Sequence, residues 1–179
     1  SGRGNPWKKG KPVVSKIAAD VYNRYIIKNY NLSLFEYDIP ILIISVNQSE
    51  DEDVIEKVKS FFRTNDPDGI FRLILAVDHT VDPADLYMVT WQLLGNSDPD
   101  RDHEYLSPNS VLVDGTIKAY RKGGFPRRWP NIVCSGNETI SAIDKKWNSL
   151  GIGALINSPS KKYQKLCRKG TDEIIINEF

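Results

Sequence analysis

Two continuous apolar runs constrain the fold more than any other feature of this sequence. IPILIISV spans residues 39–46 and IFRLILAVD spans residues 70–78, and both are rich in β-branched residues and of strand length. Neither run shows the regular apolar and polar alternation of a half-exposed strand. Strands of this kind lie inside a sheet and are covered on both faces, as in parallel sheets. The two runs therefore predict central strands of a largely parallel sheet.

Segments with helical spacing alternate with these strands. The expected helices cover residues 12–29, 49–63 and 83–95, and a fourth follows Ser135, where a capping-box spacing precedes Ile140, Ile143, Trp147 and Leu150. Short strands are expected at 110–114 and 131–135. Residues 171–179 are interpreted either as a last exposed strand or as a tail that docks on a partner. This order predicts an α/β layered fold with a largely parallel sheet flanked by helices.

The totals describe one ordinary domain without a strong overall charge. The 179 residues include 24 basic and 23 acidic side chains, so the formal net charge is +1. A net charge so close to zero does not draw the chain to nucleic acid or to a membrane surface. No apolar run approaches the roughly 20 residues that a membrane helix needs, and no secretory signal opens the sequence. We expect a cytoplasmic protein.

The composition also suggests how the chain divides. Residues 1–12, SGRGNPWKKGKP, start without Met and are polar and rich in Gly and Pro, so we interpret them as a linker or a cloning remnant of a fragment cut at a domain boundary. Residues 13–157 are expected to form the α/β domain. Residues 158–179 are expected to be the C-terminal tail.

An acidic cluster follows the second apolar run, within AVDHTVDPADLYMVTW at 76–91. Three features predict that it starts a helix: Asp82 is a favourable capping residue, Pro83 suits the first helical position, and Asp85 favours the helix dipole. Each of the capping and dipole terms contributes roughly 1 kcal/mol. This interpretation explains two of the carboxylates without any catalytic role.

Two other roles for the cluster remain open. His79 and Asp82 could both bind a metal ion, but Asp82 cannot easily cap a helix and coordinate a metal at once, and no His or carboxylate pair at helical spacing supports such a site. Ligands of open α/β sheets gather at the carboxyl ends of strands, so Asp78 and His79 are candidates for a pocket edge.

The remaining candidate residues favour structural roles. His103 is expected in a solvated loop, and Cys134 and Cys167 are expected to be reduced thiols rather than a disulfide. The basic stretch 119–130 mixes cations with aromatic residues and could hold phosphate or nucleic acid, although a solvated loop packed down by its aromatic residues is favoured. The sequence has no Gly-x-Ser-x-Gly motif, P-loop or Gly-x-Gly-x-x-Gly fingerprint. We therefore assign no catalytic, cofactor-binding or metal residue in this chain.

Several stretches of the sequence resemble one protein family. The stretch 76–102 is similar to the C-terminal domain of the UbiD family of decarboxylases in its Val-Asp strand end, its helix start, its helical Trp91 and its Asp-Pro-Asp-Arg-Asp loop at 98–102. VLVDGTIK at 111–118 resembles the family's Asp-Ala-Thr-x-Lys element, matched by Asp114, Thr116 and Lys118. GFPRRWPNIV and IDKKWNSLGI resemble the end of the same domain, especially in members of menaquinone biosynthesis. The resemblance covers roughly residues 66–152.

The resemblance implies a parent enzyme. UbiD-like proteins decarboxylate aromatic or α,β-unsaturated acids with prenylated FMN, a divalent metal and potassium, and their catalytic Glu-Arg-Glu set lies in a preceding flavin-binding domain. Their C-terminal domain chiefly packs on that flavin domain and builds the oligomer. Some members carry a lysine that faces the cofactor where this chain has Ser110, which puts that contact in doubt, and Gly115 stands for the usual Ala, a small change.

We therefore expect the C-terminal domain of a UbiD-like carboxy-lyase of quinone biosynthesis, inactive alone and without a cofactor of its own. Its partners would be the flavin-binding domain of the same parent chain and further copies in a homo-oligomer, with no nucleic acid. Exposed aromatic residues would form the docking surface; the candidates are Trp7, Tyr87, Trp91, Phe125 and Trp129. The alternatives are a non-enzymatic α/β binding or assembly module and, as a further option, a nucleic-acid-binding domain using residues 118–130.

Overall fold

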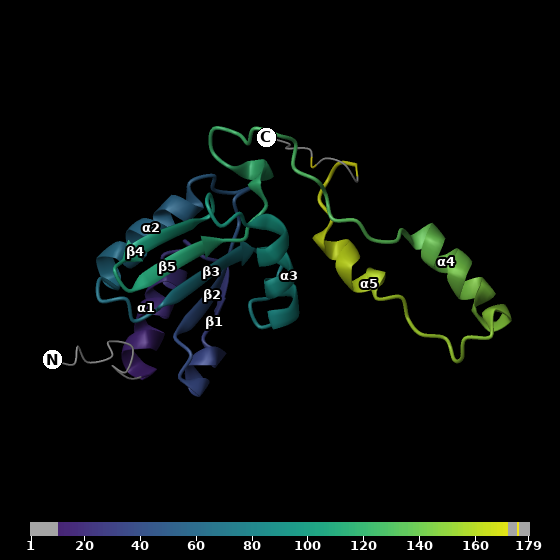
Figure 1. The fold of residues 1–179 in the computed structure, drawn as a ribbon, viewed down its shortest axis with the longest axis horizontal. Coiled ribbons are helices and arrows are strands. Elements are labelled where there is room, and N and C mark those ends of the chain that lie inside the picture. Colours follow the sequence, from purple (N-terminus) through teal and green to yellow (C-terminus); the bar gives the residue numbers. More distant parts are fainter. Residues whose placement is uncertain (1–10, 172–174, 176–179) are drawn as a thin grey trace. The chain divides into compact units, whose positions relative to one another are not determined.

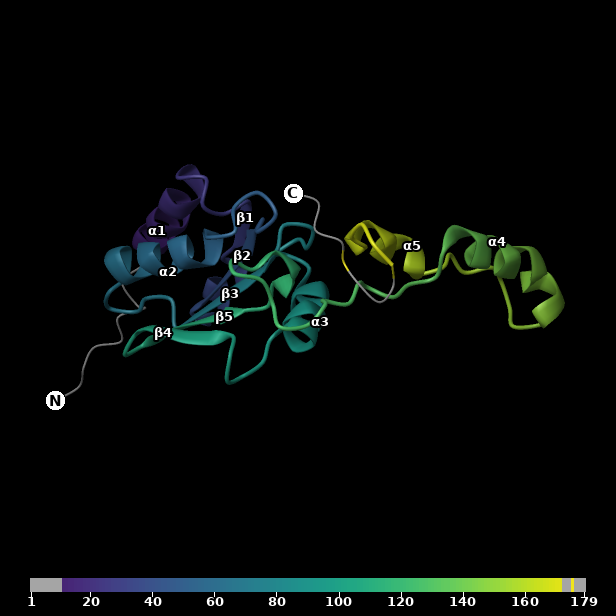
Figure 2. The same cartoon turned by 90° about the horizontal axis from the view of Figure 1, so that it is seen from above.

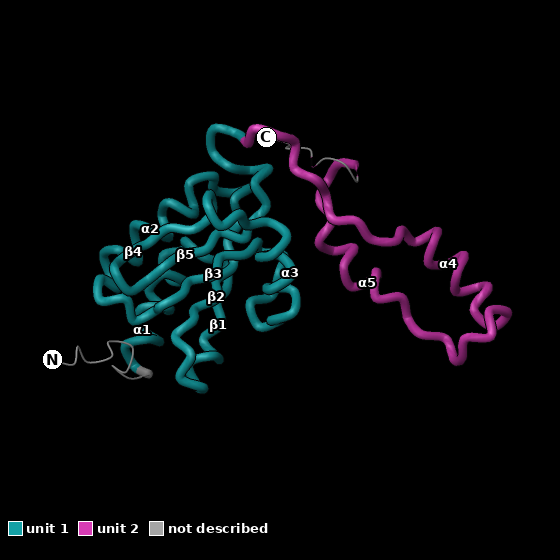
Figure 3. The backbone as a smooth tube through the Cα atoms, in the orientation of Figure 1, with its two compact units in different colours: residues 1–124 teal, residues 125–179 magenta. Residues whose placement is uncertain are grey.

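The computed structural model describes residues 11–171 and 175, and it divides into two compact units, residues 1–124 and 125–179 (Figure 3). Most of the segment interpreted as a linker, including Trp7, lies outside the described residues. None of the helices in the described part of the chain is long and apolar enough to cross a membrane.

The first unit is built on a five-stranded sheet (Figure 1). Its strands are β1 (Asn29–Asn31), β2 (Ile41–Val46), β3 (Leu73–Asp78), β4 (His103–Ser107) and β5 (Ser110–Asp114), in the order β1-β2-β3-β5-β4. The three inner strands are parallel, and β1 and β4 are antiparallel at the edges. The two apolar runs thus form adjacent inner strands, which confirms the predicted α/β fold with a largely parallel sheet.

Helices lie on both faces of this sheet. α1 (Lys11–Asn23) and α2 (Val54–Asn65) cover one face, and α3 (Leu86–Asn96) lies on the other (Figure 2). Short 3₁₀ turns, η2 (Ser33–Tyr37) and η3 (Lys118–Tyr120), complete the unit. The three helices expected before Gly95 are therefore present, although each is shorter than its apolar pattern.

The two faces of the sheet are covered unequally. The side chains on the α1 and α2 face are buried in one apolar core; the strand members of this core are Leu42, Ile44, Val46, Ile74, Ala76, Leu106 and Leu112. On the other face, the strand register places Leu73 and Leu75 beside Val111 and Val113, and all four are only half-buried. The expectation that the inner strands are covered on both sides is therefore met in full on one side only.

Two local predictions in the first unit are wrong. The helix expected from residue 83 begins at Leu86, after a turn in which the Asp85 amide donates to the Asp82 carbonyl at 3.0 Å. His103 opens strand β4 instead of lying in a loop, because β4 pairs as an antiparallel hairpin with β5. Gly69, with φ of +67°, allows the tight approach of the loop before β3 to Asn109.

The second unit contains α4 (Asn137–Lys146), η4 (Trp147–Leu150), α5 (Ser160–Tyr163) and η5 (Gln164–Leu166). The fourth expected helix is thus confirmed, but Gly136 takes the cap position and no side chain caps the helix. The Ser135 amide donates to the Ser160 hydroxyl at 3.4 Å. The strand expected at 131–135 is absent, because this extended stretch bonds to residues 160–168 largely through side chains. Of the expected last segment, Ile175 makes a single antiparallel bridge to Gly170, and most of the rest lies outside the described residues.

Candidate functional site

Asp78 ends strand β3 in a buried position and joins three elements. Its amide donates to Gln92 Oε1 at 2.9 Å, and its Oδ2 accepts from Gln92 Nε2 at 2.9 Å and from the Ile117 amide at 3.1 Å. These bonds fasten α3 and the segment after β5 to the end of the inner strand. A carboxylate with this set of donors is committed to holding the fold, and neither Asp78 nor His79 lines the charged cavity described below.

The start of α3 uses the two predicted aspartates in a different order. Asp85 is the capping residue, since its Oδ1 accepts from the Met88 amide at 3.1 Å, and Asp82 accepts from the Ala84 amide at 2.9 Å in the preceding turn. The prediction that Asp82 caps the helix and Asp85 serves the dipole is therefore wrong. Within residues 11–171 and 175, no three His, Cys, Asp or Glu side chains gather in a group that could hold a metal ion.

Lys118, the first residue of η3 and four residues after the end of β5, is fully buried. Its ammonium donates to the Asp114 carbonyl at 2.9 Å and to the Thr116 carbonyl at 2.7 Å, and it lies 3.3 Å from Asp114 Oδ2 and 3.9 Å from Asp102 Oδ1. Burial lowers the pKa of Lys118, and the nearby carboxylates of Asp114 and Asp102 oppose this shift. The Asp-x-Thr-x-Lys spacing thus builds a local network of hydrogen bonds and charges. The Thr116 hydroxyl donates to Asp114 Oδ1 at 2.5 Å, and the Lys118 ammonium donates to the Asp114 carbonyl.

Asp102 lies between this lysine and an arginine. Arg101 Nε donates to the Asp102 carboxylate at 2.9 Å, and the Asp98 amide donates to the same group at 2.8 Å. Burial raises the pKa of Asp102, but the hydrogen bonds from Arg101 and Asp98 and the charge of Lys118 bring it below its usual value. The same pairing raises the pKa of Arg101. The Asp-Pro-Asp-Arg-Asp loop is thus locked around a buried, charged carboxylate.

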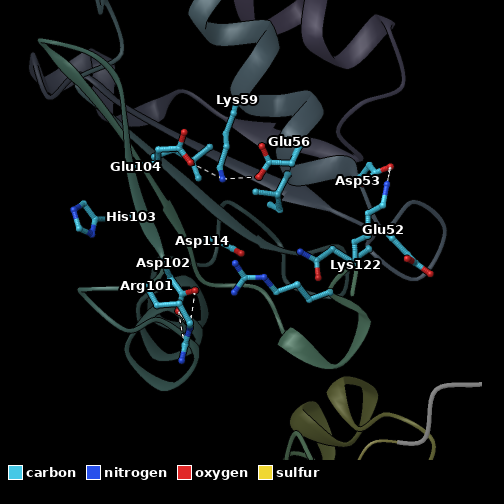
Figure 4. Close-up of a pocket in the computed structure, with 14 residues that line it drawn as sticks. Glu52, Asp53, Glu56, Lys59, Arg101, Asp102, His103, Glu104, Asp114 and Lys122 are labelled. Carbon is cyan, nitrogen blue, oxygen red and sulfur yellow. Dashed lines mark hydrogen bonds and ion pairs between the residues drawn. The ribbon is translucent and has the colours of Figure 1, made fainter. Parts of the chain in front are cut away.

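A cavity of about 290 Å³ lies beside this network (Figure 4). Charged groups line it; they are Glu52, Asp53, Glu56, Lys59, Arg101, Asp102, Glu104, Asp114, Arg121 and Lys122, with the His103 side chain beside them. Many of these charges are paired with each other: Lys59 bridges Glu56 at 2.7 Å and Glu104 at 2.6 Å, and Lys122 pairs with Asp53 at 2.8 Å. Figure 4 shows the His103 ring apart from these ion pairs.

Gln48 is a lining residue that the sequence did not reveal. Its Nε2 donates to the Thr116 hydroxyl at 3.0 Å, and that hydroxyl donates onward to Asp114, so the amide orientation is fixed. Its Oε1 is buried and accepts no hydrogen bond from the described residues. Gln92 was missed in the same way, because a lone glutamine in an apolar segment gives no pattern that predicts burial.

The aromatic residues proposed for docking divide into two groups. Tyr87 and Trp91 on α3 are 66% and 43% exposed, which confirms them as surface groups. Trp129 in the second unit is buried and Phe125 is half-buried, so the prediction is wrong for Trp129. The Arg127 guanidinium lies over both rings, 5.8 Å from the Phe125 centroid and 5.1 Å from the Trp129 centroid. It therefore occupies the ring faces on which a nucleic-acid base would stack.

Comparison with known proteins gives the family. A family model described as the 3-octaprenyl-4-hydroxybenzoate carboxy-lyase C-terminal domain matches residues 14–114. An uncharacterized protein of Archaeoglobus fulgidus is 28% identical over 98 residues, covering 46% of this chain and 20% of that protein. An uncharacterized protein of Aquifex aeolicus is 27% identical over 94 residues, covering 44% of this chain and 19% of that protein. This chain therefore spans about a fifth of the length of these relatives.

Two solved structures of the vanillic acid decarboxylase of Sedimentibacter hydroxybenzoicus, both in the open form, also resemble the chain at 18% identity. The one with truncated ShVdcD has a TM-score of 0.47 and covers 78% of this chain and 31% of that chain. The other has a TM-score of 0.43 and covers 62% and 27%. Since the family model spans more than half of the sequence, this chain belongs to the UbiD family and carries its C-terminal domain.

Proposed function

We propose that this chain is the docking and assembly part of a UbiD-like carboxy-lyase whose parent protein decarboxylates an aromatic or α,β-unsaturated acid in quinone biosynthesis. Alone, the chain is inactive. Its partner is the flavin-binding domain of the same parent, and further copies complete a homo-oligomer. The family match supports the decarboxylase context, and the pathway class rests on the resemblance inferred from the sequence of residues 124–133 and 143–152.

The observation that carries the docking role is the outer face of α3. No charged residue occurs between Leu86 and Asn96. The helix buries Met88 and Val89 against the sheet while Tyr87 and Leu94, 66% and 80% exposed, point to solvent. A surface helix normally presents polar groups on its outer side, and contiguous exposed apolar surface marks an interface.

The sheet beneath α3 supports the same role. Leu73, Leu75, Val111 and Val113 face this side and are half-buried, and Tyr105 on the edge strand β4 shares their face and is 70% exposed. Covering these side chains would remove apolar surface from water, a gain of roughly 25 cal/mol per Å². A partner domain on the α3 side of the sheet would complete the second layer that a largely parallel sheet requires.

The cavity residues of this chain do not fit the divalent metal that the family implies. Among the described residues, the cavity carboxylates Asp53, Glu56 and Glu104 are bonded to lysines, and Asp102 is bonded to Arg101. A divalent cation would have to displace those partners to gain oxygen ligands. We infer that cofactor and substrate binding belong to another domain of the parent protein.

A co-purification experiment tests the docking role. The chain is produced with the flavin-binding domain encoded upstream of it, and the complex is isolated by size exclusion. Leu94→Asp is expected to weaken association at least about tenfold, since a charge would be buried in an apolar interface. Tyr37→Asp is the matched control, because Tyr37 is 74% exposed and lies on η2 instead of α3.

Two results would contradict the proposal. Equal association of the wild type and Leu94→Asp would exclude the α3 face as the docking surface. Release of carbon dioxide from aromatic acids by this chain alone, supplied with prenylated FMN and metal, would exclude an inactive assembly domain.

A further inference from the structure

We propose that Cys134 and Cys167 form a reversible disulfide that fastens the two sides of the second unit. They are the two cysteines of the sequence, 33 residues apart, and their sulfurs lie 3.4 Å from each other. Both are thiols in the structure. Sulfurs this close need to approach by only about 1.4 Å to reach the roughly 2.05 Å of a disulfide bond.

The backbone around the pair is already held in place. The Asn131 side chain donates to the Arg168 carbonyl at 2.6 Å and accepts from the Arg168 amide at 2.9 Å. On the other side, the Gln164 side chain donates to the Ser135 carbonyl at 2.9 Å. These contacts lie on either side of Cys134 and Cys167 and hold their two segments next to each other.

The thiols are also accessible to reagents in solution. Cys167 is exposed and Cys134 is half-buried. Cationic residues surround Cys167 in the sequence; they are Lys165, Arg168 and Lys169. Positive charge of this kind favours the approach of an anionic oxidant. The oxidant is a low-molecular-weight disulfide such as glutathione disulfide.

The reaction is thiol–disulfide exchange in two steps. The Cys167 thiol loses its proton and attacks one sulfur of the oxidant, whose S–S bond breaks and releases one thiol. The Cys134 thiol then loses its proton and attacks the Cys167 sulfur of this mixed disulfide, which releases the second thiol. The two protein thiols give two electrons and two protons, which reduce one oxidant disulfide to two thiols, and an added dithiol reverses the change.

The bond would close a loop from residue 134 to residue 167 that holds α4, η4, α5 and η5. In the chain-entropy description, closing a loop of this length lowers the population of the opened unit by about two to three orders of magnitude. Proteolysis of that unit should slow accordingly wherever cleavage follows opening. Oxidation is therefore expected to stiffen the second unit and to leave the first unit unchanged.

The experiment exposes the full chain to a series of glutathione redox buffers and quenches it with acid. Mass spectrometry of the intact chain and of its peptides should show loss of two hydrogens and a bond between Cys134 and Cys167 in the monomer. Limited proteolysis should cut the second unit at least about tenfold more slowly after oxidation. Cys134→Ser should instead accumulate a glutathione adduct on Cys167 and show no protection.

The outcomes separate clearly. An intramolecular bond that forms independently of protein concentration, and that reduces reversibly, supports the proposal. Stable glutathione adducts on the wild-type chain, or disulfide-linked dimers in place of the internal bond, would overturn it. The wild-type mass measurement decides the question even where a serine variant folds poorly, and none of these results depends on the decarboxylase assignment.

Discussion

Substituting the buried Lys118 with methionine tests whether the Asp-x-Thr-x-Lys element is structural. Methionine has a similar volume and leaves no large cavity. It removes the donor to the Asp114 and Thr116 carbonyls, at 2.9 and 2.7 Å, and the cation 3.3 Å from the Asp114 carboxylate. The substitution therefore isolates the polar contribution of the lysine.

The expected loss can be estimated from these contacts. Each buried carbonyl left without a donor costs about 1–3 kcal/mol. The uncompensated charge of Asp114 adds to this cost. Methionine partly offsets it, because it carries no ammonium group whose burial is unfavourable, and that burial is what lowers the pKa of Lys118. Removing one partner of a buried ion pair costs about 3–5 kcal/mol, and we expect Lys118→Met to fall in that range.

Urea unfolding of the full chain, followed by far-UV circular dichroism, measures the loss. Lys16→Met is the control, because Lys16 is exposed on α1 and its substitution should change the free energy of unfolding by less than about 0.5 kcal/mol. A loss below about 1 kcal/mol for Lys118→Met would refute the structural role of the network.

The sign of the pH dependence gives a second readout. The pKa of Lys118 is lowered from 10.5 in the folded chain, so between the folded and unfolded values the unfolded chain binds more protons. The stability of the wild type should therefore rise with pH in that window, and this rise should be absent from Lys118→Met.

Three further predictions concern the supports of α3 and the acidic loop. Gly115→Ala is expected to destabilise the fold by about 1–3 kcal/mol in urea unfolding, because the added Cβ would lie 2.6 Å from Leu93 Cδ2 and 3.1 Å from Leu93 Cα. Glycine in place of the alanine expected from the resemblance is therefore more than a small change, and an unchanged unfolding midpoint would contradict this packing. Asp85→Ala should cost about 1 kcal/mol by loss of the cap, with Asp85→Asn retaining most of the stability by the same assay. Asp102→Asn should destabilise the fold at neutral pH. The pKa of Asp102 is lowered in the folded chain despite its burial, so the stability from pairing with Arg101 is present above about pH 4 and is lost as the pH falls through the folded pKa. Thermal unfolding that shows the same difference from the wild type at pH 7 and at pH 3 would contradict this prediction.

The apolar pattern predicted the inner part of the fold because burial leaves it few choices. Runs 39–46 and 70–78 contain too many apolar residues to lie at the surface, and they form β2 and β3 in parallel register, with Ile43 opposite Leu75. Strand β4 was missed because HEYLS buries only Leu106. A short edge strand with one anchored side chain carries almost no sequence signal, and its pairing with β5 decides its structure.

The sequence predicted helix α3 correctly, but the helix begins at Leu86, three residues later than expected. Both Asp82 and Asp85 are suitable caps, and Pro83 is as compatible with a turn as with the first helical position. The Pro83 carbonyl accepts from the Asn31 side chain at 2.9 Å, a contact between segments 52 residues apart that ties the turn to β1. Local propensity does not distinguish the two starts, and this long-range contact holds the turn that contains Pro83.

The buried charges could not be predicted from composition or periodicity. A lysine four residues after an aspartate is usually a solvated pair, yet Lys118 is fully buried and Asp102 beside it is nearly so. The family resemblance identified the Asp114, Thr116 and Lys118 pattern but gave no account of its geometry. The structural reason emerges from the hairpin, which brings Asp102 to the end of β5, where the Asp114 amide donates to its carbonyl at 2.8 Å.

These pairings bear directly on where chemistry could occur in the parent protein. A general acid or base must exchange a proton with substrate during turnover, and its pKa is normally placed near the working pH. The pKa of Asp102 is instead lowered, which favours its charged form. The Asp78 carboxylate is held by hydrogen bonds from the Gln92 side chain and the Ile117 amide. Recruiting either carboxylate would break the contacts that hold α3 and the acidic loop to the sheet. Asp78 and Asp102 thus stabilise the fold of this domain, and the charge-free outer face of α3 is the surface on which the proposed docking role rests.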